Sequence, residues 1–86
     1  MASNTTPSEI HIRHLTVDEA LYRLEPFLDN AFRAAHTKVR IIHGKGAGVL
    51  RNAVHQLLSG HPLVRTYQTA LPNDGDTGVT IATLDI

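Results

Sequence analysis

Two segments of helical periodicity, each preceded by a short run of β-forming residues, constrain the fold of this chain more than any other feature. Apolar residues recur at spacings of three and four through residues 16–35, and again through residues 49–58. Strand-like segments lie before, between and after them, at residues 9–14, 38–43, 63–70 and 78–86. The order β-α-β-α-β-β predicts an α/β chain that folds as an α+β two-layer sandwich, with a four-stranded mixed sheet and both helices on one face.

The ends of the two predicted helices carry recognisable signals. Thr16, with Glu19 three residues later, forms a capping box that satisfies two backbone donors at a helix start. The apolar periodicity continues past Pro26, so one helix with a kink is predicted there rather than two helices. The second helix is predicted to end near Gly60, because Pro62 prevents it from resuming. The last two strands are joined by a loop and are predicted to be antiparallel neighbours.

Length and composition bound the class of protein. The 86 residues suffice for one compact domain. Residues 1–8 are predicted to be a flexible N-terminal tail or linker remnant, and residues 9–86 to be the domain. The chain has no cysteine, which excludes disulfides and cysteine metal sites. Residues 1–9 lack the basic and apolar regions of a signal peptide, and no apolar run approaches the ~20 residues that cross a bilayer, so a cytoplasmic location and no membrane partner are expected. The formal net charge is zero, which argues against a protein that binds nucleic acid through an overall positive charge alone.

A glycine-rich turn, "HGKGAG" at residues 43–48, joins the second predicted strand to the second helix. It fails the dinucleotide pattern G-x-G-x-x-G, and it lacks the Gly-Lys-Ser/Thr ending of a nucleotide P-loop. Gly44, Gly46 and Gly48 leave bare backbone whose N–H groups a ligand can approach closely, and the helix start adds the positive end of a dipole. Lys45 adds a full charge, so the turn suits a phosphate group.

Six histidines in so short a chain need separate interpretations. His43 lies at the end of the strand beside this turn, and its ordinary pKa suits a general acid or base. His36 is predicted to favour the dipole at the end of the first helix. His55 falls outside the second apolar stripe and is predicted to be solvated. No pair of histidines or carboxylates has the spacing of a metal site, so no metal ligand is assigned.

Four segments in order resemble the small MutS-related (Smr) domain, over residues 10–84: "IHIRHLTVDEAL", "VRIIHGKGAGVLRNAV", "HPLVRTYQ" and "GDTGVTIATL". They are most similar to the Smr domain at the C-terminus of a bacterial MutS paralogue that suppresses recombination. The resemblance implies the two-layer fold predicted above. It also implies a nucleic-acid-binding endonuclease that nicks DNA, branched DNA included, or cleaves RNA.

The resemblance also implies roles for individual residues. His43, Lys45, Arg13 and His11 are then the catalytic candidates, with His43 as acid/base. The residues implied to bind the phosphate backbone are Gly44, Lys45, Gly46, Gly48, Arg13 and Arg51.

One family motif departs from its usual form. The family reads Leu-Asp-x-His/Arg-Gly after the first strand, whereas this chain reads Ile10-His11-Ile12-Arg13-His14. Arg13 matches the arginine variant, but His11 replaces the acidic residue, and a histidine cannot supply a negative charge. Binding is expected to survive this change, while cleavage stays open. The alternatives are therefore a nuclease, a catalytically weak module that docks on nucleic acid or the ribosome, and, less favoured, a small-anion or nucleotide-binding module.

The resemblance leaves cofactor and partners partly open. Mg²⁺ or Mn²⁺ is a candidate cofactor, and none is assigned with certainty. DNA or RNA is the expected partner, with the ribosome as a further candidate. If the chain is part of a longer protein, an N-terminal MutS-like ATPase segment is expected, with a role in recombination control or ribosome rescue.

Overall fold

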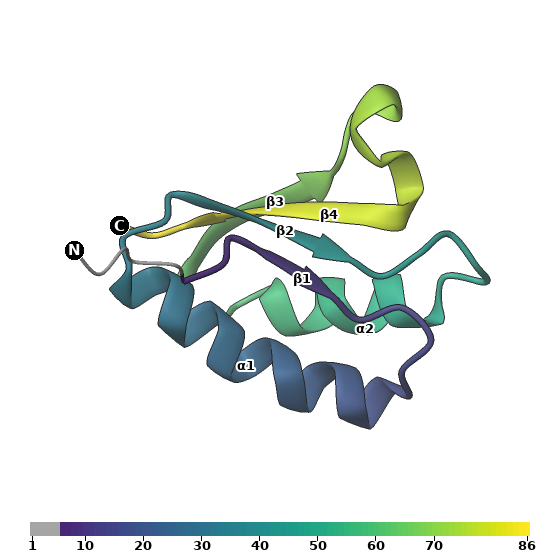
Figure 1. Cartoon of the computed structure of the whole chain (residues 1–86), viewed down its shortest axis with the longest axis horizontal. Helices are drawn as coiled ribbons and strands as arrows, with labels where there is room; N and C mark the ends of the chain where they lie inside the picture. The colour runs from purple at the N-terminus through teal and green to yellow at the C-terminus, as the bar shows by residue number, and fades with distance from the viewer. Residues whose placement is uncertain (1–5) are drawn as a thin grey trace.

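The chain alternates strands and helices in the predicted order. The computed structural model describes residues 6–86. Its elements are β1 (Glu9–His11), α1 (Val17–Arg33), β2 (Lys38–Ile42), α2 (Val49–Leu58), β3 (Val64–Thr69), the short 3₁₀ helices η1 (Pro72–Asp74) and η2 (Asp76–Gly78), and β4 (Val79–Leu84). The β-α-β-α-β-β prediction is confirmed (Figure 1).

The four strands form one mixed sheet in the order β1-β2-β4-β3. β1 runs parallel to β2, as expected for strands joined through a helix. β4 is antiparallel to both of its neighbours, β2 and β3, so the predicted pairing of the last two strands is confirmed. Ile41 of β2 lies opposite Thr80 of β4, which places these two side chains on the same face of the sheet.

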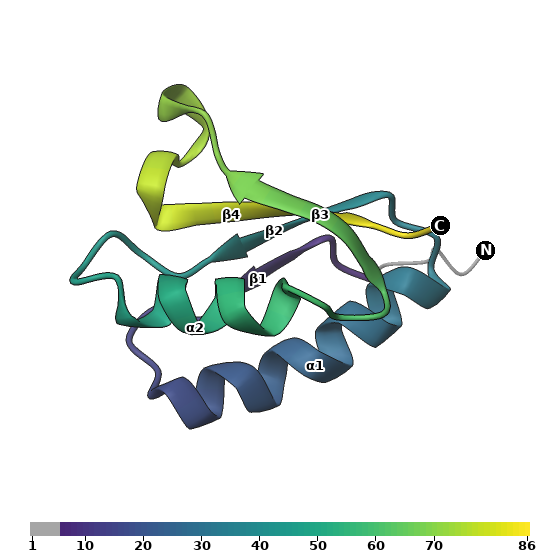
Figure 2. The same ribbon diagram turned by 180° about the vertical axis from the view of Figure 1, so that it is seen from behind.

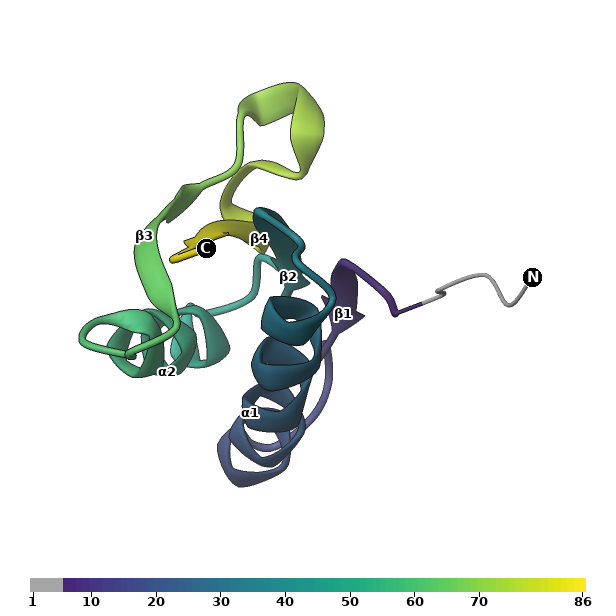
Figure 3. The ribbon, with the colours of Figure 1, turned by 90° about the vertical axis from the view of Figure 1, so that its left-hand side faces the viewer.

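Both α-helices cover the same face of the sheet, and within residues 6–86 the other face carries no α-helix (Figures 2 and 3). The buried residues of β2, Val39 and Ile41, alternate with partly exposed Arg40 and Ile42, as expected for a strand with one covered face. The core between sheet and helices consists of Ile12, Ala20, Leu24, Phe27, Leu28, Ala31, Val39, Ile41, Val54, Leu58, Ala82 and Leu84.

Helix α1 has well-defined signals at both ends. Thr16 Oγ1 accepts from the Glu19 amide at 3.1 Å, and the Glu19 carboxylate accepts from the Thr16 amide at 3.1 Å, so the capping box is confirmed. The helix continues through Pro26 without a break. After its last residue, Ala35 adopts a left-handed backbone with φ 64°. The Ala35 amide bonds to Phe32 O and the His36 amide to Ala31 O, which is the Schellman pattern.

The first strand is shorter than predicted. β1 ends at His11 instead of residue 14, although the Ile12 amide still donates to Ile42 O at 2.9 Å. His14 has φ 67°, and such a left-handed residue cannot continue a strand. The turn is needed because the chain must leave the sheet and enter the Thr16 cap within a few residues.

The predicted boundary between tail and domain stays a prediction, because residues 1–5 of the predicted tail lie outside the described residues. The described part of the tail contacts the domain: Thr6 O accepts from His36 Nε2 at 2.8 Å, and Ser8 O accepts from the Arg40 amide at 2.9 Å. In the described part of the chain, residues 6–86, no helix has the length and apolar character to cross a membrane.

Candidate functional site

The glycine loop, residues 43–48, leads from the carboxyl end of β2 to the first turn of α2. Gly48 is the N-cap of α2, with φ 87°, and no side chain of residues 6–86 caps the helix. The guanidinium of Arg51 lies beside it, because a β-carbon added to Gly48 would stand 3.2 Å from Arg51 Nη2. The α2 start therefore combines uncapped backbone donors with a cation.

A second segment holds the glycine loop in place. The carbonyl oxygen of Gly78 accepts from two consecutive amides, His43 N at 3.0 Å and Gly44 N at 2.9 Å. A β-carbon on Gly78 would stand 3.2 Å from Lys45 Cγ, so the two segments touch closely. The Lys45 ammonium lies 3.5 Å from Asp76 in the same segment, and its side chain is 67% exposed. The turn after β3 therefore supports the loop, a role that the sequence analysis did not assign.

A hollow of about 240 Å³ lies between the glycine loop and the segment after β1. Its lining residues are Arg13, His14, His43, Gly44, Lys45, Gly46, Ala47, Gly48 and Leu50. Arg13 also packs on Gly44, whose β-carbon would stand 3.5 Å from Arg13 Cγ. The structure thus brings together all the predicted phosphate-binding residues: Arg13, Gly44, Lys45, Gly46 and Gly48 at the hollow, and Arg51 at its Gly48 edge.

His43 lies at the edge of this hollow, but its ring is turned into the protein. The residue is only 4% exposed. Nδ1 lies 3.1 Å from the Gly44 carbonyl oxygen, and Nε2 lies 2.8 Å from Thr80 Oγ1. Both ring nitrogens are therefore engaged inside the protein rather than facing a bound phosphate. The acid/base role of His43 stays a prediction, and it requires the ring to be released from these contacts.

His55 is the histidine that the sequence placed wrongly. It is partly buried, and its Nε2 lies 2.8 Å from the same Thr80 hydroxyl that His43 contacts. Its ring centroid lies 6.3 Å from that of His43 and 5.0 Å from that of Tyr67 on β3. The prediction of a solvated His55 is wrong because α2 packs against β3 and β4, where Tyr67 and the Thr80 hydroxyl contact the ring.

The electrostatic surroundings keep both rings neutral. Burial is the main cause that lowers the pKa of His43; the bond to Gly44 O opposes this, and the charge of Arg51 adds to it. Burial also lowers the pKa of His55, followed by the charges of His43 and Arg51. Because each pKa lies below the ordinary 6.5, both imidazoles are mainly neutral at pH 7.

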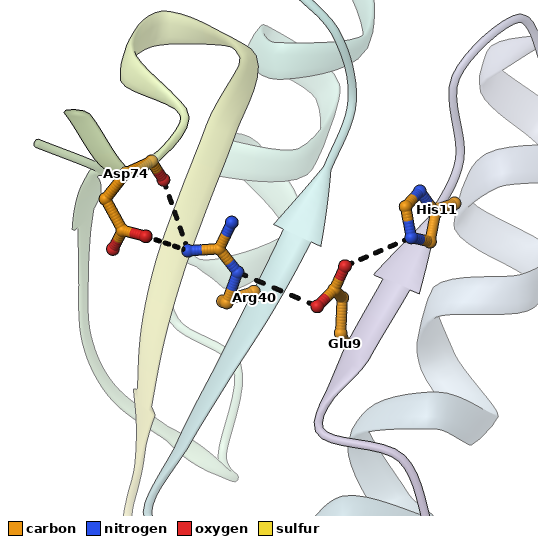
Figure 4. Close-up of polar contacts among 4 residues, drawn as sticks. All are labelled: Glu9, His11, Arg40 and Asp74. Atoms are coloured by element: carbon orange, nitrogen blue, oxygen red, sulfur yellow. Dashed lines mark hydrogen bonds and ion pairs between the residues drawn. The ribbon is translucent and has the colours of Figure 1, made fainter. Parts of the chain in front are cut away.

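His11 lies on the other face of the sheet. It pairs with Ile42 in the register of β1 and β2, one residue before His43, so the two imidazoles point to opposite faces. On the open face His11 Nε2 lies 3.1 Å from Glu9, which contacts Arg40 at 3.8 Å, and Arg40 bonds Asp74 at 2.6 Å (Figure 4). The structure therefore does not bring His11 together with His43, and its predicted catalytic role stays a prediction.

The described residues do not assemble a ready metal site. No group of three or more His, Cys, Asp or Glu side chains within residues 6–86 lies close enough to hold an ion. The nearest acidic group to the glycine loop is Asp76, which already pairs with Lys45. A Mg²⁺ or Mn²⁺ cofactor stays a prediction.

Comparison with known proteins gives a consistent assignment. The family model "Smr domain" matches residues 10–85. A protein named Endonuclease MutS2 from Thermomicrobium roseum is 50% identical over 78 residues, which cover 91% of this chain and 10% of that protein. The Endonuclease MutS2 of Lachnospira eligens is 46% identical over 74 residues, 86% of this chain and 9% of that protein. The chain thus spans about a tenth of the length of these curated relatives.

Two solved structures agree with this. The crystal structure of the Smr domain of Thermus thermophilus MutS2 superposes with a TM-score of 0.90 at 35% identity, covering 92% of this chain and 99% of that one. YdaL, a stand-alone small MutS-related protein from Escherichia coli, superposes with a TM-score of 0.85 at 26% identity, covering 94% and 66% of the two chains. The predicted resemblance is confirmed: this chain belongs to the Smr domain family.

Proposed function

We propose that this domain binds the sugar-phosphate backbone of a nucleic acid, with one phosphate held in the hollow at the glycine loop. The observation that carries the proposal is the start of α2, which no side chain of the described residues caps. Free amides at a helix start suit phosphate oxygens. Arg13, Lys45 and Arg51 come from three separate segments and place positive charge around the same point.

Gly46 supports the same conclusion. Its φ is not positive, and a β-carbon added there would meet nothing within 4 Å. Neither backbone geometry nor packing within the protein therefore accounts for a glycine at this position. Close approach of a ligand to the backbone does account for it, because Gly46 lines the hollow.

The zero net charge of the chain is compatible with this site. Lys45 is paired with Asp76 only through an exposed contact of 3.5 Å, and such contacts are worth about 0–1 kcal/mol. A phosphate that also accepts bonds from the loop amides can replace the carboxylate at little cost. Affinity is then expected to depend on a few local contacts and to be modest.

Phosphodiester cleavage is the second candidate. It is favoured by the intact His43-Gly44-Lys45-Gly46 segment and by relatives that are named endonucleases. The inward ring of His43 weighs against a poised acid or base, so cleavage would need the ring to leave Thr80 when substrate binds.

Within a longer MutS-like protein of the cytoplasm, we propose that the domain contacts DNA during recombination control. RNA or the ribosome is the alternative target.

Binding is tested by fluorescence anisotropy with labelled single-stranded, duplex and branched DNA and with RNA, at several salt concentrations. We expect Lys45→Gln to weaken binding to all of them and to reduce the slope of log affinity against log salt for duplex DNA by about 0.9. Lys38→Gln is the matched control, because Lys38 lies at the opposite end of β2. Equal effects of the two substitutions, or no salt-sensitive binding at all, would refute the proposed site.

Cleavage is tested separately with supercoiled plasmid, branched DNA and RNA, with and without Mg²⁺ or Mn²⁺. Nicking by the unmodified protein that disappears in His43→Ala supports the second candidate. Salt-dependent binding without nicking under any condition leaves the domain as a binding module only.

A further inference from the structure

Thr80 sits between two histidines and contacts both. Its Oγ1 lies 2.8 Å from His43 Nε2 and 2.8 Å from His55 Nε2. The residue is fully buried at 0% exposure. A hydroxyl carries a single hydrogen, so it can donate to only one of the two imidazoles. Thr80 must therefore accept a hydrogen bond from the other ring.

The direction of these bonds follows from the Gly44 carbonyl. This oxygen can only accept, so the proton of His43 lies on Nδ1, 3.1 Å away. A neutral imidazole has one N–H, which leaves His43 Nε2 as an acceptor. Thr80 then donates to His43 Nε2 and accepts from His55 Nε2–H. The side chains form a one-way chain, His55 to Thr80 to His43 to the Gly44 carbonyl.

We propose that Thr80 and His55 are positioning residues that hold His43 in its Nδ1–H tautomer and, through it, hold the Gly44 carbonyl at the entrance of the glycine loop. The effect of these residues on nucleic-acid binding rests on the proposed function, in which the glycine loop holds a phosphate. Thr80 lies in β4 and His55 in α2, both outside the His43-Gly44-Lys45-Gly46 segment, and neither lines the hollow. They act on the site only through His43.

The row of hydrogen bonds from His55 to the Gly44 carbonyl also determines how His43 gains a proton. His55 Nδ1 has no partner among the described residues and is not a buried unsatisfied atom, so it is open to solvent. A proton added there lets His55 Nε2 pass its hydrogen to Thr80, and Thr80 passes its own to His43 Nε2. The count balances: one proton enters at His55, and His43 becomes the imidazolium. The two bonds through Thr80 reverse in direction, His43 Nδ1 still donates to the Gly44 carbonyl, and no side chain needs to move.

The two imidazoles therefore share the first proton that they take up. Binding of a second proton, which would charge both rings, is unfavourable. The ring centroids are 6.3 Å apart, and Arg51 acts on both rings from α2. Two other groups lie next to these hydrogen-bonded residues. Tyr67 of β3 contacts the ring of His55, and Arg13, from the segment after β1, contacts Gly44. None of these supplies a negative charge that would favour two imidazoliums.

The test is nitrogen-15 NMR of the histidine rings in the whole domain, as a function of pH. At pH 8 we expect His43 to carry its hydrogen on Nδ1 and His55 on Nε2. On acidification, the first proton should appear at both rings with the same apparent midpoint. Finding the hydrogen of His43 on Nε2, or two independent titrations, would overturn the inference, and this measurement needs no variant.

Two substitutions of Thr80 separate positioning from packing. Thr80→Val keeps the volume and removes the hydroxyl, whereas Thr80→Ser keeps the hydroxyl and removes a methyl group. If the hydroxyl positions His43, the valine variant should move the His43 Nε2 signal to that of an unbonded nitrogen and uncouple the two titrations, while the serine variant keeps both. If Thr80 only packs, the serine variant should be the more disturbed.

Nucleic-acid affinity is measured on the same samples. We expect a loss of about two- to tenfold in Thr80→Val, the factor that one hydrogen bond of ordinary strength represents, and recovery in Thr80→Ser. An unmodified domain with the expected ring signals that bound neither DNA nor RNA would refute the proposed function and leave the chain of bonds intact. Strong binding with independent titrations would do the reverse.

Discussion

The side chain of Arg13 lies against the backbone of Gly44, 3.5 Å from the position that a β-carbon of Gly44 would occupy. This contact joins the segment after β1 to the glycine loop, and both segments line the same hollow. Two parts of the chain that are thirty-one residues apart in the sequence (44 − 13) thus form one wall of the candidate site. Substitution of individual glycines in the loop can test what each of them contributes to this wall.

Alanine substitutions at Gly44 and at Gly46 should affect different properties, the first stability and the second binding. Gly44 has φ 86°, where a side chain costs about 1–2 kcal/mol, so Gly44→Ala should lower the free energy of unfolding by about that amount. Gly46 has neither a positive φ nor a neighbour within 4 Å, so Gly46→Ala should fold normally and bind nucleic acid more weakly. Urea denaturation and anisotropy on both variants check this; undiminished binding by Gly46→Ala would contradict the phosphate site.

Stability should fall when the pH is lowered through the range of histidine titration. The pKa values of His43 and His55 are lowered in the folded protein, so below about pH 6.5 the unfolded chain binds protons that the folded chain still refuses. The free energy of unfolding should therefore be full above that pH and decrease as the pH falls toward the folded-state values. Urea denaturation at pH 7.5, 6.5 and 5.5 measures this, and the dependence should be shallower in His55→Gln.

The end of α1 offers a stabilising substitution. Ala35 adopts φ 64° in the Schellman turn, a position that glycine takes without strain. Relief of that strain, less the entropy that glycine adds to the unfolded chain, should make Ala35→Gly more stable by about 0.5–1 kcal/mol. Ala34→Gly is the control, because Ala34 has φ −81° and should lose stability. A melting temperature that falls in both variants would contradict the assigned geometry.

The ion pairs of the sheet should differ in strength according to burial. Arg40 has a side chain that is 34% exposed, and it bonds both the carboxylate and the backbone oxygen of Asp74. Arg65 pairs with Asp85 through a side chain that is 60% exposed. We expect Arg40→Gln to cost about 1 kcal/mol and Arg65→Gln to cost about 0–0.5 kcal/mol. Equal costs in chemical denaturation would mean that Arg40 does not tie β2 to the turn after β3.

Local signals were sufficient to predict most of the fold. The capping box of Thr16 and Glu19 and the apolar spacing of α2 depend on neighbours within a few residues, so they are readable before any tertiary contact is known. The end of β1 was not predictable, because the alternation of polar and apolar residues runs on through Arg13, past the last residue of the strand at His11. In the family motif the position of His14 is usually glycine, and its replacement by histidine removed the signal for a turn.

The site was predictable only where a motif carried it. The glycine loop and its cations follow from residues that are adjacent in the sequence, whereas Thr80 belongs to a segment that reads simply as a β-branched strand. His55 lies off the apolar stripe, and only the crossing of α2 over β4 turns that position inward. The inward ring of His43 has the same cause, since its partner lies thirty-seven residues away.

The order of the strands has a consequence for how the domain forms during synthesis. β4 is the last strand to leave the ribosome, yet it lies between β2 and β3 in the sheet. Until it emerges, the edge of β2 that pairs with β4 has no partner, and β3 has no neighbouring strand. The four-stranded sheet cannot be completed before the chain has been made through Leu84, so a nascent chain stalled earlier would present unpaired backbone to chaperones and proteases instead of a finished sheet.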